Sequence, residues 1–238
     1  FAVAGSNIYV GTETGLAISA NSGATFSMPA ANNQNITALV ADSTAVTYGT
    51  SNGELFTGTG TSLTKVAGFP TAKRINDIAI KGADTYVAAA NGLYKGNALT
   101  AVVGDQISVS ASGTNVVSAS STAIMLSAND AAFTVVNLAA DMGIINNVRI
   151  IGSSLYVATS TGLWKGSVST VPGLTKVTNF PAIAVNNISS PDGTQLYVST
   201  TDGLYISSTD GTFPTEDLDQ KTISDGLAGN NVLKAVVA

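Results

Sequence analysis

The sequence predicts an all-β fold, a six-bladed β-propeller built from four-stranded antiparallel blades. A phrase of about ten residues recurs six times along the 238-residue chain, and the copies align on one position. That position is Gly in five copies and Ala in a degenerate fourth copy, at intervals of 38, 39, 39, 31 and 41 residues: Gly15, Gly53, Gly92, Ala131, Gly162 and Gly203. A period of about 40 residues is typical of propeller blades. We therefore expect a single domain over residues 1–238.

Each phrase predicts a hairpin that supplies the two middle strands of a blade. In the copies at 155–164 and 196–205, an aliphatic and aromatic run ends in Thr, crosses a polar pair and Gly, and restarts with Leu and an aromatic residue. Gly at that place suits a turn with positive φ. We expect such turns at all five glycines, and we expect the following aromatic residues to pack between blades at equivalent places: Tyr94, Trp164 and Tyr205.

Short apolar runs on either side of the phrases predict the other two strands. The runs before the phrases predict inner strands at 36–40, 75–80, 116–119, 148–151 and 183–188. The runs after them predict edge strands at 63–66, 99–102 and 174–177, two of which precede a Phe-Pro stop at 69–70 or 180–181. The predicted blades lie near 1–31, 32–70, 71–110, 111–143, 144–181 and 182–238. The short interval after the fourth copy predicts trimmed outer strands and one helical turn at 138–142.

Composition excludes several classes of function. The chain is 45% hydrophobic without an apolar run long enough to span a membrane, and it contains no cysteine for disulfides or thiol chemistry. A net charge of −5, with ten basic residues dispersed along the chain, argues against nucleic acid as a partner. The sequence starts on Phe1, inside a repeat and without a visible signal peptide, so we expect a processed product or a segment of a longer chain.

Two motifs carry a resemblance to known propeller families. Ser19-Ala20-Asn21-Ser22-Gly23-Ala24-Thr25-Phe26 resembles the Asp-box hairpin with Asn for Asp and Phe for Trp, and 208–213 resembles a shortened copy. The segment 223–232 is similar to the Asp-Gly-Leu-Pro-x-Asn-x-Val opening of two-component-regulator-type propeller repeats. The resemblance implies a secreted or surface-exposed bacterial propeller, with the Asp boxes as structural turns, and it carries no activity.

The residue census predicts that the chain is not an enzyme. It contains no His or Cys, which removes the common nucleophile arrangements and imidazole or thiolate metal sites. Sialidase-type propellers grip their substrate with three arginines, and this chain has two. A carboxylate pair for glycoside hydrolysis is the surviving alternative, but nearly all of the acidic residues fall in predicted turns. We expect no cofactor and no catalytic residue.

Two clusters are candidates for ligand binding. Asparagines precede the predicted inner strands, where side-chain amides around a channel mouth would suit sugar hydroxyls or exposed backbone: Asn33, Asn35, Asn76, Asn146, Asn147, Asn186 and Asn187. Tolerance of turn conformations by Asn is the alternative explanation, and we favour it. An acidic stretch could hold Ca²⁺, although a solvated loop explains it better: Asp210, Glu216, Asp217 and Asp219.

The two ends of the chain compete for one strand position. Residues 1–4 stand where the inner strand of the first blade belongs, and the C-terminal run after Asn230-Asn231 also reads as an inner strand: Val232, Leu233, Ala235, Val236 and Val237. An apolar strand of this kind needs a hydrogen-bonding partner. We expect that partner to be the strand around Ile8-Tyr9-Val10. Either the tail closes its own ring and residues 1–4 form an extension, or the tail enters a neighbouring subunit.

These observations predict a non-enzymatic extracellular or cell-surface binding or assembly module. The leading hypothesis is association with a protein partner or with further copies, including filaments formed by exchange of terminal strands. A carbohydrate-binding, lectin-like propeller is the alternative, and a glycoside hydrolase is a weaker one. Membrane insertion is not expected.

Overall fold

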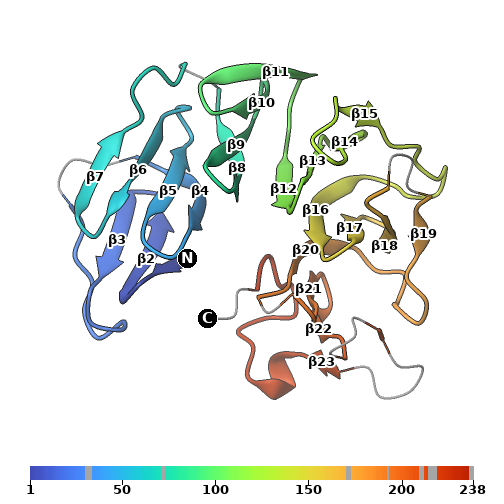
Figure 1. Cartoon of the computed structure of the whole chain (residues 1–238). Helices are drawn as coiled ribbons and strands as arrows, with labels where there is room; N and C mark the ends of the chain where they lie inside the picture. Colours follow the sequence, from blue (N-terminus) through green and yellow to red (C-terminus); the bar gives the residue numbers. More distant parts are fainter. Residues whose placement is uncertain are drawn as a thin grey trace. The chain divides into compact units, whose positions relative to one another are not determined.

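The fold is a six-bladed β-propeller. The computed structural model describes residues 1–29, 34–70, 73–169, 173–191, 193–208, 212–213 and 219–235 (Figure 1). The strands of these residues form six antiparallel sheets, one for each blade, and the single helical element is the short 3-10 helix η1 (Ile223–Asp225). No helix in these ranges is long and apolar enough to cross a membrane.

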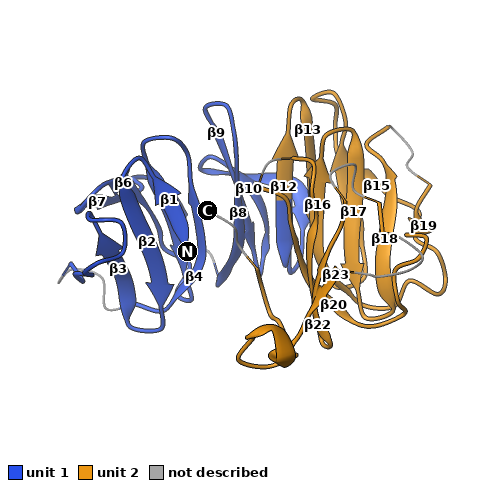
Figure 2. Cartoon of the chain, turned by 90° about the horizontal axis from the view of Figure 1, so that it is seen from below, with its two compact units in different colours: residues 1–109 blue, residues 110–238 orange. Residues whose placement is uncertain are grey.

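The chain divides into two compact units, residues 1–109 and 110–238 (Figure 2). The first unit holds three sheets. Their strands are β1 (Ala2–Ala4), β2 (Asn7–Thr12) and β3 (Gly15–Ser19); β4 (Ile36–Ala41), β5 (Val46–Thr50), β6 (Leu55–Thr59) and β7 (Ser62–Lys65); and β8 (Ile75–Lys81), β9 (Asp84–Ala89), β10 (Gly92–Lys95) and β11 (Ala98–Val103).

The fourth sheet begins at the boundary between the units, and the second unit contains the fifth and sixth sheets. Their strands are β12 (Ser108–Ser112), β13 (Asn115–Ala119), β14 (Ile124–Ser127) and β15 (Thr134–Val135); β16 (Ile145–Ile151), β17 (Ser154–Thr159), β18 (Gly162–Ser167) and β19 (Thr175–Lys176); and β20 (Val185–Ser189), β21 (Tyr197–Thr200), β22 (Gly203–Ile206) and β23 (Asp219–Lys221).

The first blade departs from the four-strand prediction. Its sheet has three strands, and the fourth position is reduced to a single bridge in which Ile18 and Ser27 exchange two backbone hydrogen bonds of 2.8 Å. The Asp-box-like segment between them explains the difference, because residues that would extend an edge strand form a closed loop. In that loop the backbone N–H of Gly23 donates to Ser19 Oγ at 2.8 Å, and that of Thr25 donates to Asn21 Oδ1 at 2.9 Å.

The fourth blade shows that one strand assignment was wrong. Residues 116–119, predicted as an inner strand, belong to β13, the second strand of the sheet, and the serine-rich β12 is the first. The hairpin therefore turns at 120–123, where Ser120 N–H donates to Ala123 O at 2.9 Å, and Ala131 lies in the next loop. Because the turn at 120–123 has no glycine, the alignment of the repeats took Ala131 as the equivalent of the repeat glycine.

The outer part of the fourth blade is trimmed, as predicted, since β15 has two residues. The helical turn predicted for 138–142 is absent. An isolated turn takes its place, in which Met142 N–H donates to Ala139 O at 3.1 Å. Met142 is buried in the apolar cluster of this unit, and Gly143 follows with a φ of 73°, which ends the turn because that φ lies outside the right-handed helical region.

The repeated glycines and aromatic residues behave as predicted. All five glycines have φ between 78° and 151°, in the region that favours Gly. Tyr94, Trp164 and Tyr205 are buried in apolar clusters formed by successive blades. The Phe residues of the two Phe-Pro stops complete these clusters, with ring centroids of Phe69 and Phe180 each 5.3 Å from those of Tyr94 and Tyr205.

Candidate functional site

A β-bulge recurs at the start of the first strand in four sheets. The register shifts between the first and third residues of each bulge, at Ile36/Ala38, Ile75/Asp77, Ile145/Asn147 and Val185/Asn187. A bulge leaves one residue outside the ladder and redirects its side chain. The residues redirected here are Thr37, Asn76, Asn146 and Asn186.

Each redirected side chain holds the chain at the start of the following first strand. We call the side chains of Asn76, Asn146 and Asn186 the amide clamps. Their Nδ2 atoms donate to the backbone carbonyls of Gln106, Val185 and Val232, respectively, each at 2.8 Å. Thr37 Oγ1 donates in the same way to Ile75 O at 2.5 Å. The clamps are therefore contacts between successive repeats.

The third residue of each bulge makes a second contact of this kind. Asp77 Oδ2 accepts from the backbone N–H of Val109 at 3.1 Å, and Asn147 Oδ1 accepts from that of Ile188 at 3.3 Å. In both cases the donor lies three residues after the carbonyl held by the clamp. Asn187 has the same place in the sixth sheet, and its buried Oδ1 has no partner within the described residues.

The C-terminal segment, Val232–Ala235, is fixed at its first residue as if a further blade began there. Val232 N–H donates to Thr200 O at 2.9 Å, matching the bond of 3.0 Å from Gln106 N–H to Ala89 O, and Val232 O accepts from the Asn186 clamp. No strand is formed by these four residues. Val236 and Val237, also predicted for the tail strand, lie outside the described residues.

The N-terminal residues occupy part of the strand edge that was expected to accept the tail. Residues 1–4 are no extension, because β1 pairs with β2 through Ala2↔Tyr9, Val3↔Ile8 and Ala4↔Asn7. A two-residue turn containing Gly5, with a φ of 58°, forms this hairpin locally, which costs less chain entropy than pairing with a distant tail. The described pairing of β1 stops at Tyr9, so positions 10–12 of β2 pair with β3 alone.

The predicted ligand-binding asparagines have several different environments. Asn33 lies outside the described residues, and Asn35 is half-buried with its backbone carbonyl accepting from Ser51 N–H. Asn147 and Asn187 are buried, while Nδ2 of each amide clamp is engaged with backbone. Ligand binding by this group stays a prediction. Sequence reasoning missed Thr37 and Asp77, which the shared position after each strand start could have revealed.

The acidic stretch offers no described metal site. Asp219 pairs with Lys221, with Oδ1 and Nζ 2.5 Å apart, and the other predicted ligands, Asp210, Glu216 and Asp217, lie outside the described residues. Across the described ranges, no group of three acidic side chains lies close enough to hold a metal ion.

Comparison with known proteins identifies the fold. No protein-family model matches the sequence, and no curated protein matches it. The extracellular domain of BT4673 from B. thetaiotaomicron is similar in structure, with a TM-score of 0.75 and 17% identity over 97% of this chain and 34% of that chain. The computationally designed Ika8 protein gives a TM-score of 0.72 and 11% identity, covering 96% of this chain and 74% of its own.

A third similar structure is PorZ, an essential bacterial surface component of the type-IX secretion system of Porphyromonas gingivalis. Its TM-score is 0.63, with 12% identity over 87% of this chain and 31% of PorZ. The chain thus spans about a third of the length of BT4673 and PorZ. At these identities the similarity is one of fold.

Proposed function

We propose that this chain is a non-enzymatic extracellular or cell-surface assembly module that joins copies by strand addition. In this proposal the C-terminal segment of one copy adds to the uncovered positions 10–12 of β2 in another. The observation that carries it is the buried Asn187 Oδ1, which finds among the described residues no backbone donor like those of its equivalents Asp77 and Asn147.

The repeat geometry supplies the donor and the register. The missing donor stands three residues after Val232, which is the backbone N–H of Ala235. In the complete sheets the first residue of the first strand pairs with the Thr or Ala that ends the second strand, as Val185 pairs with Thr200. The same register places Val232 opposite Thr12 and Ala235 opposite Val10.

This register fits the space that β1 leaves. The added strand would reach Val10 and stop before Tyr9, where the pairing with Ala2 begins. Strand addition would satisfy unpaired backbone groups on both partners, since an uncovered strand edge is a template for another chain. The extracellular BT4673 domain and the surface component PorZ, both similar in fold, support placing this module outside the cell.

Disulfide trapping tests the proposal directly, because the chain has no native cysteine. Two single variants, Val10→Cys and Ala235→Cys, are purified separately, mixed and oxidised. We expect a disulfide-linked dimer of one chain of each kind. Val103→Cys, at a residue that is 67% exposed and outside the predicted pairing, replaces Val10→Cys in the control mixture.

Two further variants separate the outcomes. A double variant carrying both cysteines that forms only an intramolecular disulfide would overturn strand exchange in favour of closure within one chain. Added in excess as a competitor, the native chain should suppress formation of the mixed dimer, whereas Ala235→Pro, which lacks the backbone donor, should not. Equal crosslinking by the Val103→Cys control would also reject the assignment.

A further inference from the structure

The second unit contains a pocket next to the edge of the fifth sheet. Its volume is about 310 Å³. We call this cavity the lysine pocket. Its polar wall consists of Lys165, Thr175, Lys176, Thr178, Asn179 and Thr212. Pairing of β18 with β19 places Lys165 opposite Thr175 on one face of the sheet and Lys176 opposite Trp164 on the other, so Lys165 is the lysine whose side chain shares the face of Tyr156.

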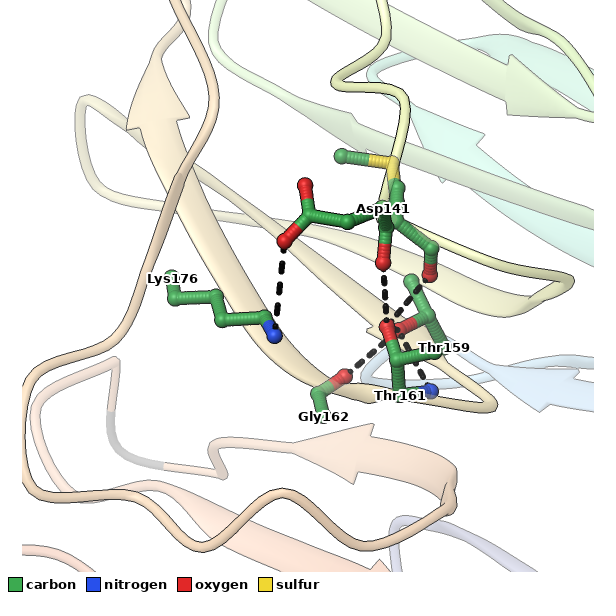
Figure 3. Close-up of polar contacts among 6 residues, drawn as sticks. Asp141, Thr159, Thr161, Gly162 and Lys176 are labelled. Carbon is green, nitrogen blue, oxygen red and sulfur yellow. Dashed lines mark hydrogen bonds and ion pairs between the residues drawn. The ribbon is translucent and has the colours of Figure 1, made fainter.

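The two ammonium groups have different partners. Lys176 Nζ lies 3.5 Å from Asp141 Oδ2 and 5.4 Å from the centroid of the Trp164 ring (Figure 3 shows the ion pair). Lys165 is half-buried, and its Nζ lies 5.2 Å from the centroid of the Tyr156 ring. No carboxylate of the described chain pairs with Lys165. The pocket therefore carries one ammonium charge that the described residues leave uncompensated.

Hydroxyl and amide groups surround this charge. Thr178 Oγ1 makes no hydrogen bond within the described residues, and Thr175 Oγ1 makes a long one of 3.5 Å to Lys165 O. Asn179 adopts a φ of 63°, and its Nδ2 donates to Phe213 O at 3.1 Å, which fixes the amide. The wall thus combines a positive charge with groups that both donate and accept hydrogen bonds.

We propose that the lysine pocket binds a carboxylated sugar, such as a terminal uronic acid. The ammonium group of Lys165 meets the carboxylate, and the threonine hydroxyls meet the hydroxyls of the ring. A volume of about 310 Å³ lies at the lower end of ligand sites, which suits one or two sugar residues. A singly charged ligand also suits a chain whose net charge is −5, whereas a densely charged polyanion would be repelled.

Isothermal titration calorimetry provides the binding assay. It needs no reporter in the pocket, which suits this chain because the only tryptophan, Trp164, pairs with Lys176 on the face of the sheet opposite Lys165. The probes are glucuronic acid, its neutral counterpart glucose, acetate and a glutamate-containing dipeptide. We expect saturable binding of glucuronic acid that weakens with salt, and no saturation with glucose.

Lys165→Met tests the charge, because it removes the ammonium group and keeps an unbranched side chain beside Tyr156. We expect at least about a tenfold loss of glucuronic acid affinity. Lys221→Met, which removes a lysine that pairs with Asp219, is the matched control and should bind normally. Both variants should keep the parental melting temperature.

Four results would overturn the proposal. Equal binding of glucose would show that the carboxylate contributes nothing to affinity. Equal binding of acetate would show that the sugar ring contributes nothing. Tighter binding of the dipeptide would assign the pocket to acidic peptides. Unchanged affinity in Lys165→Met would place the ligand elsewhere. None of these results bears on strand exchange, which the cysteine variants test separately.

Discussion

Replacement of Gly162 isolates the conformational requirement of the repeated hairpin. Gly162 has a φ of 138°, which side chains of L-residues rarely adopt. A Cβ atom at this position would meet only Pro181 O at 3.6 Å, an ordinary contact. The cost of Gly162→Ala is therefore backbone strain without a steric clash, and Gly162→Val adds the restriction of a β-branched side chain.

The structure gives a magnitude and a ranking. A residue held in such a region costs about 1 to 3 kcal/mol, offset by about 0.4 to 1 kcal/mol because Ala restricts the unfolded chain. We expect Gly162→Ala to lower the unfolding free energy by about 1 to 2 kcal/mol. Gly92→Ala should cost more, since its Cβ would also lie 2.6 Å from Leu99 Cδ1 and 2.9 Å from Val102 O.

Urea unfolding followed by Trp164 fluorescence and by circular dichroism measures these changes. With a slope of about 3 kcal/mol per molar urea, a loss of 2 kcal/mol moves the midpoint by about 0.7 M. Gly173→Ala is the control, because Gly173 lacks a positive φ and no atom lies within 4 Å of its Cβ position. A midpoint for Gly162→Ala equal to that of Gly173→Ala would refute the reasoning.

Three further predictions concern burial, pH and the clamps. Trp164 should emit at shorter wavelength than free indole and resist acrylamide quenching, since it is 3% exposed; emission like that of free indole would contradict its packing. Hydrogen bonds from Lys65 and Gln34 lower the pKa of Glu54, so its stabilising contribution is present above the unfolded pKa of about 4.3 and is lost as pH falls through the lower folded value. Glu54→Gln should therefore flatten the fall of the urea midpoint between neutral and acidic pH, and an unchanged profile would refute this role. Asn146→Ala should cost about 1 to 3 kcal/mol in urea unfolding by leaving Val185 O without its donor, and a change below about 0.5 kcal/mol would mean that water replaces the amide.

The sequence alone determined the repeat architecture, because its signals are local. A Gly three residues after the end of an apolar strand predicts a hairpin, because the turn needs a positive φ that Gly adopts easily. The aromatic residue two positions later lies in the next strand, where it is expected to be buried. These rules placed Gly162 and Trp164 correctly. They misplaced the fourth blade, where the turn at 120–123 has no glycine and the first strand is serine-rich.

The tertiary structure decided which polar residues serve the fold and which remain available. Asn76 and Asn146 look like candidate ligands in the sequence, yet a bulge turns each amide onto the next repeat. The same geometry singles out Asn187, whose buried Oδ1 has no donor in the described part of the chain, and no local pattern distinguishes it from Asn147. Lys165 and Thr178 lie thirteen residues apart and become neighbours in the lysine pocket only when β18 pairs with β19. Strand order follows from local periodicity, whereas a site depends on contacts between distant residues, which local periodicity does not encode.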